Sequence, residues 1–364
     1  MVKIVTVLYD GGKAAQEEPR LLGTTENCLG LREYCQKNGH ELIVTSDKEG
    51  ANSVFQKETT GENGAAILVS TPFHPAYLTK EIIDKSPNLK LAVTAGIGSD
   101  HVDLNAAASK GITVAEVTGS NVVSVAEHVI MTMLILVRNY NVGHALSMPG
   151  GSWSVGEVAR NEFDLEGKVI GTIGAGRIGY RVLERLVPFN PSKLYYYDYN
   201  ELPAEAAKKV GVERVHDLNE FLQKCDVVTV NCPLHEGTID LINKDNIKHL
   251  KGKWLINTAR GAICNAEAVA EAVNSGSLLG YGGDVWNKQP FPENHPWKAM
   301  VGPNGRGNAM TLHTSGTSLD AQARYAKGTI EIIDNFLNNK PQRKEDLIVD
   351  AGGYATAAYG QRNK

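Results

Sequence analysis

Short apolar runs alternate along the chain with segments in which apolar residues recur three and four positions apart. The first pattern is typical of strands buried in a sheet, and the second of helices that cover it. In the first third of the chain we predict strands at residues 4–8, 41–45, 66–70, 90–95 and 113–117, with helices near residues 26–37 and 77–85. This order predicts a parallel sheet covered by helices.

A second series of the same kind follows. Its predicted strands are residues 169–173, 194–197, 227–231, 254–257 and 279–284. Between the two series lies an apolar helical segment, residues 122–146, and the chain ends in an amphipathic helix at residues 319–337 with no strand predicted to pair with it. Such a helix can return to the first series. Because 364 residues exceed one typical core, we expect two domains.

Composition excludes several classes of function. The net charge is −4 without a long block of one sign, so nothing favours nucleic acid or an anionic membrane as a partner. Residues 122–137 are the nearest approach to a membrane span, but they include Glu127 and His128 and are better explained as a buried helix. Five cysteines without C-x-x-C spacing argue against a zinc site or disulfide framework. No metal is therefore expected. The first residues, MVKIVTVLYD, lead directly into a strand pattern without a basic leader, so a cytoplasmic location is expected.

The most specific motif is KVIGTIGAGRIG at residues 168–179. A β-branched run leads into Gly174, Gly176 and Gly179, and a helical pattern follows, which is the context of a dinucleotide fingerprint. In such a motif the glycines permit a tight turn, close approach of a pyrophosphate and close helix packing. Asp198 follows the next strand, where a carboxylate can bind both ribose hydroxyls and repel a 2′-phosphate. This carboxylate therefore favours NAD over NADP.

Other polar residues follow strands of the second series. Arg260, Asp284 and His313 each come after an apolar run, and Pro233 ends another strand. Taken singly, Arg260 is equally compatible with a binding role and with a surface salt bridge. A lone aspartate such as Asp284 is more often a turn residue, and a lone histidine such as His313 is usually structural. In open α/β sheets, however, ligands bind beyond the carboxyl ends of the strands, so these residues are candidates for a common site.

Together these motifs resemble the D-2-hydroxyacid dehydrogenase superfamily. The longer segments STPFHPAYL, AGIGSDHVDL, EVTGSNVVSVAEH, NTARGAI, GYGGDVW and SGTSLDAQARYA narrow the resemblance to metal-free NAD-dependent formate dehydrogenases, particularly fungal forms. The resemblance runs from Lys3 to Gly360. It implies two Rossmann-like doubly wound parallel-sheet domains with the active site in the cleft between them. Residues 1–118 and 317–364 would form the substrate domain, and residues 119–316 the NAD-binding domain.

The resemblance also implies a reaction: oxidation of formate to carbon dioxide by direct hydride transfer to nicotinamide C4, in a homodimer to which the helix from Val122 contributes. Arg260 and Asn121 would hold formate, and His313 would stand beside it, hydrogen-bonded to Gln289. Apolar substrate contacts would come from Pro72, Phe73 and Ile97. The positions implied to contact NAD are Gly174, Gly176, Arg177, Ile178, Gly179, Asp198, Pro233, Leu234, His235, Glu236, Gly237, Thr258, Asp284, His313, Thr314, Ser315 and Gly316.

Gln289 carries a chemical argument within this resemblance. A 2-hydroxyacid dehydrogenase moves a proton as well as a hydride and commonly pairs its histidine with a glutamate, whereas formate oxidation releases no hydroxyl proton. A neutral glutamine suits formate oxidation better. Leu312 and Thr314, where the family commonly has proline and tyrosine, leave the geometry of the loop around His313 open.

Two alternatives remain. A D-2-hydroxyacid dehydrogenase would act on glyoxylate, pyruvate or hydroxypyruvate, and it is disfavoured by Gln289 and Phe73. An NAD-sensing binding protein of the corepressor type would bind cofactor without turnover. Arg260, Asn121 and His313 count against it, because a sensor needs no complete set of residues that hold an anion.

Overall fold

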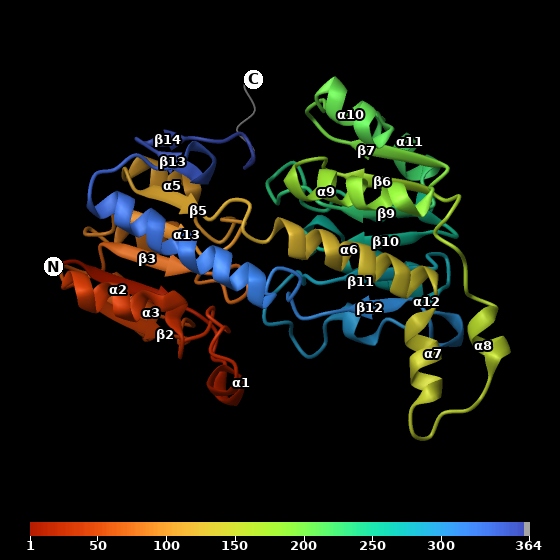
Figure 1. The fold of residues 1–364 in the computed structure, drawn as a ribbon, viewed down its shortest axis with the longest axis horizontal. Coiled ribbons are helices and arrows are strands. Elements are labelled where there is room, and N and C mark those ends of the chain that lie inside the picture. The colour runs from red at the N-terminus through yellow and green to blue at the C-terminus, as the bar shows by residue number, and fades with distance from the viewer. Residues whose placement is uncertain (360–364) are drawn as a thin grey trace. The chain divides into compact units, whose positions relative to one another are not determined.

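The computed structural model describes residues 1–359, and its residues form two compact units (Figure 1). Unit 1 comprises Met1–Asn121 and the described residues from Gly316 onward, and unit 2 comprises Val122–Ser315. Each unit contains a 7-stranded sheet. Helices cover both faces of each sheet, so the predicted α/β class with two Rossmann-type sheets is confirmed.

The sheet of unit 1 is largely parallel. Strands β1 to β5 pair in parallel in the order β5-β4-β3-β1-β2, with bounds β1 Lys3–Val7, β2 Glu41–Thr45, β3 Ile67–Ser70, β4 Leu91–Thr94 and β5 Thr113–Glu116. Two further strands, β13 (Leu347–Asp350) and β14 (Gly353–Tyr354), extend it antiparallel beyond β5. The prediction that no strand follows the last helix was therefore wrong. β14 has only 2 residues, too few to give an alternation, whereas β13 is a 4-residue apolar run, as long as β3, that the prediction missed.

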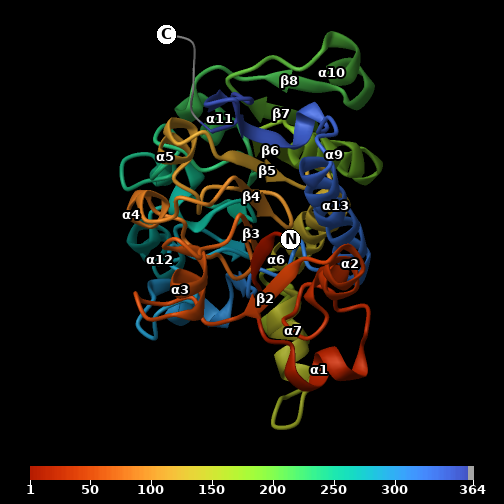
Figure 2. The ribbon, with the colours of Figure 1, turned by 90° about the vertical axis from the view of Figure 1, so that its left-hand side faces the viewer.

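Helices lie on both faces of this sheet (Figure 2). One face carries α2 (Leu31–Asn38) and α13 (Leu319–Leu337), and the other carries α3 (Val54–Thr59), α4 (Lys80–Asp84) and α5 (Leu104–Ser109). The short helix α1 spans Gly12–Glu17. The predicted start of α2 at residue 26 was wrong, because Leu29 and Gly30 have left-handed backbone (φ 57° and 72°) and delay the helix to Leu31.

All strands of the sheet in unit 2 are parallel, in the order β12-β11-β10-β9-β6-β7-β8. The bounds are β6 Val169–Ile173, β7 Lys193–Tyr197, β8 Val212–Arg214, β9 Val227–Val230, β10 Trp254–Asn257, β11 Gly280–Gly283 and β12 Asn308–Met310. The prediction lacked β8 and β12. Both are 3 residues long, which is too short for a periodic signal.

Two hydrophobic cores cover the faces of this sheet. The helices α6 (Val122–Val137) and α9 (Arg177–Leu186) contribute to one core, and α11 (Leu218–Lys224) and α12 (Ala266–Asn274) to the other. Residues of one strand alternate between them, as Ile256 and Leu255 do. The remaining helices are α7 Tyr140–Ser147, α8 Val155–Ala159 and α10 Ala204–Val210.

The predicted continuous helix at residues 122–146 is broken. Asn139 has a φ of 49°, and the chain bends by 71° between α6 and α7. Asparagine tolerates this left-handed conformation better than most residues, so the apolar pattern continues across a break in the backbone. Within residues 1–359, no single helix has the length and hydropathy needed to cross a membrane, and α6 and α7 meet that test only as a bent pair.

Candidate active site

The predicted polar residues of unit 2 lie along one edge of its sheet. All strands run in the same direction, so their carboxyl ends meet at this edge. Following the order of the strands from β12 to β7, the loops carry His313, Asp284, Arg260, Pro233, the glycine turn from Gly174 and Asp198. Sheet topology thus places these residues along the same side of the sheet, although Gly174 and His313 are 139 positions apart in the sequence.

The three motif glycines have different surroundings. Gly174 has a φ of 88°, and a Cβ there would lie 2.7 Å from the backbone nitrogen of Cys232. A Cβ at Gly179 would lie 2.0 Å from the carbonyl oxygen of Gly174, so helix and turn pack directly on each other. At Gly176, by contrast, no heavy atom lies within 4 Å of a Cβ position. Gly176 is also the N-cap of α9, which lacks a side-chain cap, so the loop fits a pyrophosphate.

Asp198 faces this turn. Its Oδ2 accepts a hydrogen bond from the Ala175 backbone nitrogen (2.8 Å), and its Oδ1 accepts one from Asn200 (2.9 Å). A carboxylate oxygen has two lone pairs, so each retains capacity for a hydroxyl donor. Nearby strand ends carry buried polar atoms that have no partner within the described structure, namely Thr258 Oγ1 and Asn231 Oδ1. Such atoms are expected where a polar ligand completes the site, and this set fits a dinucleotide.

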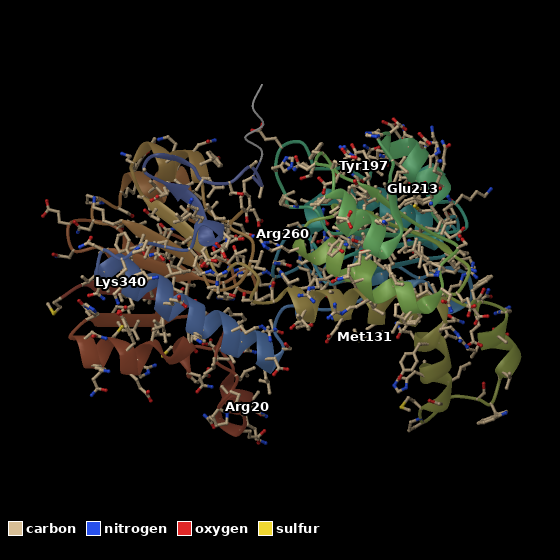
Figure 3. The ribbon with its side chains drawn as sticks, turned by 45° about the horizontal axis from the view of Figure 1, so that its top comes forward. Arg20, Met131, Tyr197, Glu213, Arg260 and Lys340 are labelled. Atoms are coloured by element: carbon tan, nitrogen blue, oxygen red, sulfur yellow. The ribbon has the colours of Figure 1, made fainter. Side chains whose placement is uncertain are left out.

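Arg260 extends from a tightly hydrogen-bonded turn after β10 (Figure 3). The side chain of Asn257, which is fully buried, holds this turn: its Nδ2 donates to the Arg260 carbonyl oxygen (2.9 Å), and its Oδ1 accepts from the Ala259 backbone nitrogen (3.1 Å). A Cβ at Gly261 would lie 2.1 Å from the Trp286 carbonyl carbon. Sequence reasoning did not assign Asn257 a role, although its place at the strand end was visible.

His313 and Gln289 form the predicted pair. Gln289 Nε2 lies 2.8 Å from His313 Nδ1, and the Trp286 backbone nitrogen donates to Gln289 Oε1 (3.3 Å). That second bond orients the amide so that its nitrogen faces the imidazole. Gln289 therefore donates to Nδ1, which places the proton of neutral His313 on Nε2. The imidazole can offer a hydrogen bond through Nε2 to a bound anion.

Asp284 fixes the loop that carries His313. Its carboxylate is fully buried and accepts hydrogen bonds from Thr311 Oγ1 (2.6 Å), the Thr314 backbone nitrogen (2.7 Å) and the Ser315 backbone nitrogen (2.7 Å). His313 itself has a φ of 61°, an unfavourable conformation for a non-glycine residue. Leu312 is 68% exposed, and the hydrogen bonds to Asp284 hold the loop whose geometry the sequence left open.

In unit 1, the predicted substrate contacts follow three adjacent parallel strands. Pro72 and Phe73 come after β3, Ile97 after β4 and Asn121 after β5. A Cβ built on Gly316 would lie 2.6 Å from Asn121 Nδ2 and 3.0 Å from Phe73 Cζ, so these side chains lie close to one another. Asn121 is 5% exposed, and its Oδ1 has no partner among the described residues. The arrangement places one amide beside an aromatic ring.

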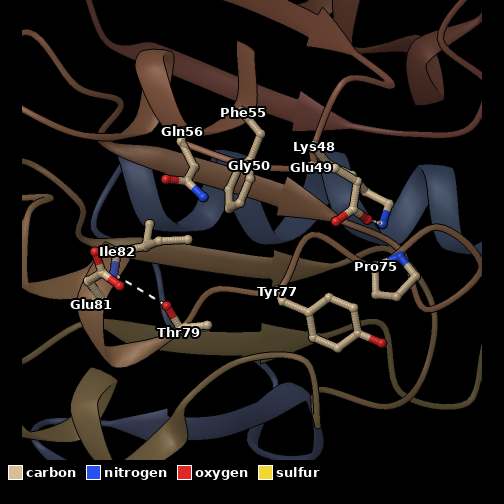
Figure 4. Close-up of a pocket in the computed structure, with 10 residues that line it drawn as sticks. All are labelled: Lys48, Glu49, Gly50, Phe55, Gln56, Pro75, Tyr77, Thr79, Glu81 and Ile82. Carbon is tan, nitrogen blue, oxygen red and sulfur yellow. Dashed lines mark hydrogen bonds and ion pairs between the residues drawn. The ribbon is translucent and has the colours of Figure 1, made fainter. Parts of the chain in front are cut away.

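A pocket of about 250 Å³ lies elsewhere in unit 1 (Figure 4). The buried Lys48 forms an ion pair with Glu49 there. The lining residues are Lys48, Glu49, Gly50, Phe55, Gln56, Pro75, Tyr77, Thr79, Glu81 and Ile82. None of the predicted site residues belongs to this set, although Pro75 and Tyr77 lie in the loop after β3 that also carries Pro72 and Phe73.

The cysteines are buried free thiols. Burial raises the pKa of Cys35 to about 11 and those of Cys225 and Cys232 to about 12. At neutral pH these three thiols are therefore almost entirely protonated, and little reactive thiolate is present. Residues 1–359 contain no group of three or more His, Cys, Asp or Glu side chains placed to hold a metal ion.

Comparison with known proteins agrees with this geometry. Residues 130–304 match the model of the D-isomer specific 2-hydroxyacid dehydrogenase NAD binding domain. A formate dehydrogenase of Pichia angusta is 58% identical over 363 residues, covering 99% of each chain. Among solved structures, a formate dehydrogenase of Granulicella M. is 44% identical with a TM-score of 0.91, covering 98% of this chain and 100% of that one.

A second solved structure contains the cofactor. The NAD-dependent formate dehydrogenase of Staphylococcus aureus, in complex with NAD, is 41% identical with a TM-score of 0.85, covering 95% of this chain and 99% of that one. Both the level of identity and the coverage of nearly the whole chain exclude a similarity confined to the dinucleotide-binding fold. The chain therefore belongs to the formate dehydrogenase family, within the D-2-hydroxyacid dehydrogenases.

Proposed function

We propose that this protein oxidises formate to carbon dioxide with NAD as hydride acceptor. The observation that favours formate over a 2-hydroxy acid is the pairing of His313 with a neutral glutamine, Gln289, at 2.8 Å. A carboxylate in place of Gln289 would raise the pKa of the imidazole and prepare it for proton transfer. Formate oxidation needs no such transfer, because the product has no hydroxyl group.

The substrate is an anion with two oxygens and one transferable hydrogen. In our proposal, the Arg260 guanidinium binds the carboxylate through charge-assisted hydrogen bonds, and Asn121 Nδ2 donates to it as well. His313 donates from Nε2, since Gln289 occupies Nδ1. Phe73, Pro72 and Ile97 exclude water and larger acids. These contacts align the C–H bond for transfer rather than supplying an acid or a base.

When bound, NAD would supply the positively charged nicotinamide as the acceptor of the hydride that formate loses on conversion to carbon dioxide. The turn from Gly174 to Gly179 holds the pyrophosphate, Asp198 binds the ribose hydroxyls, and Thr258 and the loop from Pro233 to Gly237 line the cofactor. A hydrogen bond stabilises the loop from Pro233 to Gly237, because the buried Thr238 hydroxyl donates to the Pro233 carbonyl oxygen (2.8 Å). Asp284 and residues 313–316 complete this set.

The proposal includes a homodimer in the cytoplasm that serves one-carbon metabolism. Large apolar side chains are exposed along α6 to α8, including Met131 (44%), Tyr140 (55%) and Trp153 (97%). Several exposed large apolar side chains in one stretch of the chain support the proposed protein interface. Molar mass from light scattering would test the dimer, with a value near the 39.3 kDa of one chain contradicting it.

Replacing Asp198 with alanine is expected to weaken the preference for NAD over NADP. The carboxylate lies beside the glycine turn, and its removal deletes both an acceptor for ribose hydroxyls and a charge that repels a 2′-phosphate. We expect the ratio of kcat/KM for NAD to that for NADP to fall by about 10-fold or more, corresponding to at least about 1.4 kcal/mol. An unchanged ratio would contradict this role of Asp198.

The reaction itself is tested by absorbance at 340 nm with purified protein, NAD and formate. Parallel samples contain NADP, lactate or glycerate, and none receives added metal. We expect absorbance to rise with formate and NAD only. A rise with the hydroxy acids instead would indicate a 2-hydroxyacid dehydrogenase, whereas cofactor binding without turnover of any substrate would indicate an NAD sensor.

A further inference from the structure

We infer that the C-terminal segment, residues 343–359, positions two loops of unit 1 that hold the substrate, and that Tyr359 is the positioning residue for the loop of Ile97. The inference rests on the proposed function, in which Ile97 and Asn121 contact formate. The segment follows α13 and includes β13 and β14. Neither the motifs nor the reaction give it a role.

The loop of Ile97 depends on bonds from outside itself. Gly96 and Gly98, on either side of Ile97, have φ values of 137° and 112°, which other residues rarely adopt. Glycine also costs more conformational entropy to fix than other residues, so this loop needs external restraint. The Gly98 backbone nitrogen donates to Glu116 Oε2 (3.0 Å), and Ser99 Oγ lies 3.0 Å from the same oxygen.

The Tyr359 hydroxyl joins this network at its centre. It accepts a hydrogen bond from the Ser99 backbone nitrogen (2.8 Å) and donates one to Glu116 Oε2 (2.9 Å). A single hydroxyl thus bonds to both the loop and the carboxylate that holds the loop. Glu116 is 5% exposed, and a buried carboxylate is stable only where donors replace the water it has lost. Removing the hydroxyl therefore weakens two restraints on the loop.

The same segment also restrains the chain that leads to Asn121. The Thr118 backbone nitrogen donates to Asp346 Oδ1 (3.0 Å), and Thr118 Oγ1 donates to the Glu345 carbonyl oxygen (2.8 Å). Asp346 is 4% exposed, and burial raises its pKa to about 6, so its carboxylate is ionised and accepts this bond at pH 8. Both loops are thus bonded to residues more than 200 positions later in the sequence.

Tyr359→Phe tests the inference, because it removes only the bridging hydroxyl. Tyr354→Phe is the matched control: it makes the same change in the same segment, where the hydroxyl donates to Asn105 Oδ1 (3.0 Å) on α5. For Tyr359→Phe we expect KM for formate to rise about 3- to 10-fold, with kcat changed less than about 2-fold and KM for NAD unchanged. The inhibition constant of azide, a linear triatomic anion, should rise in parallel. Tyr354→Phe should match the wild type.

A second measurement does not require turnover. Hydrogen exchange of the peptide that spans residues 96–102 should become about 5-fold faster or more in Tyr359→Phe and remain unchanged in Tyr354→Phe. If Tyr359→Phe does not fold, Ser99→Ala replaces it in both measurements, since it removes another hydroxyl from Glu116.

The outcomes separate the inference from the proposed function. If the wild type oxidises formate but both tyrosine variants give the same constants and the same exchange rates, the positioning role is wrong and the function stands. If the wild type does not oxidise formate, the proposed function fails, and faster exchange in Tyr359→Phe alone would still support restraint of the loop. Equal exchange would refute that restraint as well.

Discussion

Replacing Arg260 with alanine is expected to lower kcat/KM for formate by about 30-fold to 1000-fold. The guanidinium is the one side chain in our proposal that brings a full positive charge to the substrate. A charge-assisted contact in a site that excludes water contributes about 2 to 4 kcal/mol to transition-state stabilisation, which converts to this range of rates. Initial rates at 340 nm over a range of formate concentrations measure the effect.

A second variant at position 260 separates the geometry of the guanidinium from its charge, and a surface arginine provides the control. Arg260→Lys retains the charge but loses the planar pair of donors, so it should recover only part of the activity. Arg20→Ala is the surface control: Arg20 is paired with Glu18 and its side chain is 74% exposed, so kcat/KM should not change (Figure 3). Near-normal activity of Arg260→Ala would show that the substrate assignment is wrong.

Replacing Asp284 with asparagine is expected to lower kcat/KM by about 10-fold to 100-fold. The carboxylate accepts hydrogen bonds from two backbone amides and one hydroxyl, and the amide group of asparagine would direct N–H bonds at one of these donors. Each buried donor left without an acceptor costs about 1 to 3 kcal/mol. Since His313 has an unfavourable backbone conformation, the loop should relax and disturb its pairing with Gln289.

The control for this variant is Asp226→Asn in the same sheet. Asp226 Oδ2 accepts from the Val169 backbone nitrogen (2.8 Å) at the start of β6, the opposite end from the candidate site. Thermal unfolding should show some loss of stability in both variants, while only Asp284→Asn should lose activity. Equal kcat/KM in the two variants would mean that Asp284 does not hold the His313 loop in an active conformation.

The long periodic elements were predictable from local pattern. Strands β2, β6 and β10 and helix α13 occur at the predicted residues, because each packs a regular set of apolar side chains against a hydrophobic core. The errors occurred where backbone conformation overrides the pattern. Asn139 breaks an apolar stretch that reads as one helix, and Leu29 and Gly30 delay the start of α2. Strands β8, β12 and β14, at the edges of their sheets, have too few residues for a period, and the 4-residue strand β13 was missed.

For the candidate site, the motifs predicted the side chains but not what holds them. Arg260, His313, Gln289 and Asp284 were all predicted as site residues. Their support comes through bonds to backbone groups and through residues distant in the sequence, as between Asp284 and the amides of Thr314 and Ser315. Backbone amides have no residue-specific signature, so no spacing rule could reveal Asn257, Thr311 or Tyr359 as supports.

The sequence by itself determined the fold class, the dinucleotide fingerprint and the candidate residues, because hydrophobic periodicity and glycine chemistry act over a few neighbouring positions. Tertiary structure decided which strand ends are neighbours, how Asp284 holds the loop of His313 and how the C-terminal segment is bonded to the loop of Ile97. These features depend on contacts between residues up to 260 positions apart. Local periodicity carries no information about such contacts, since they form only when the strands pair in the folded chain.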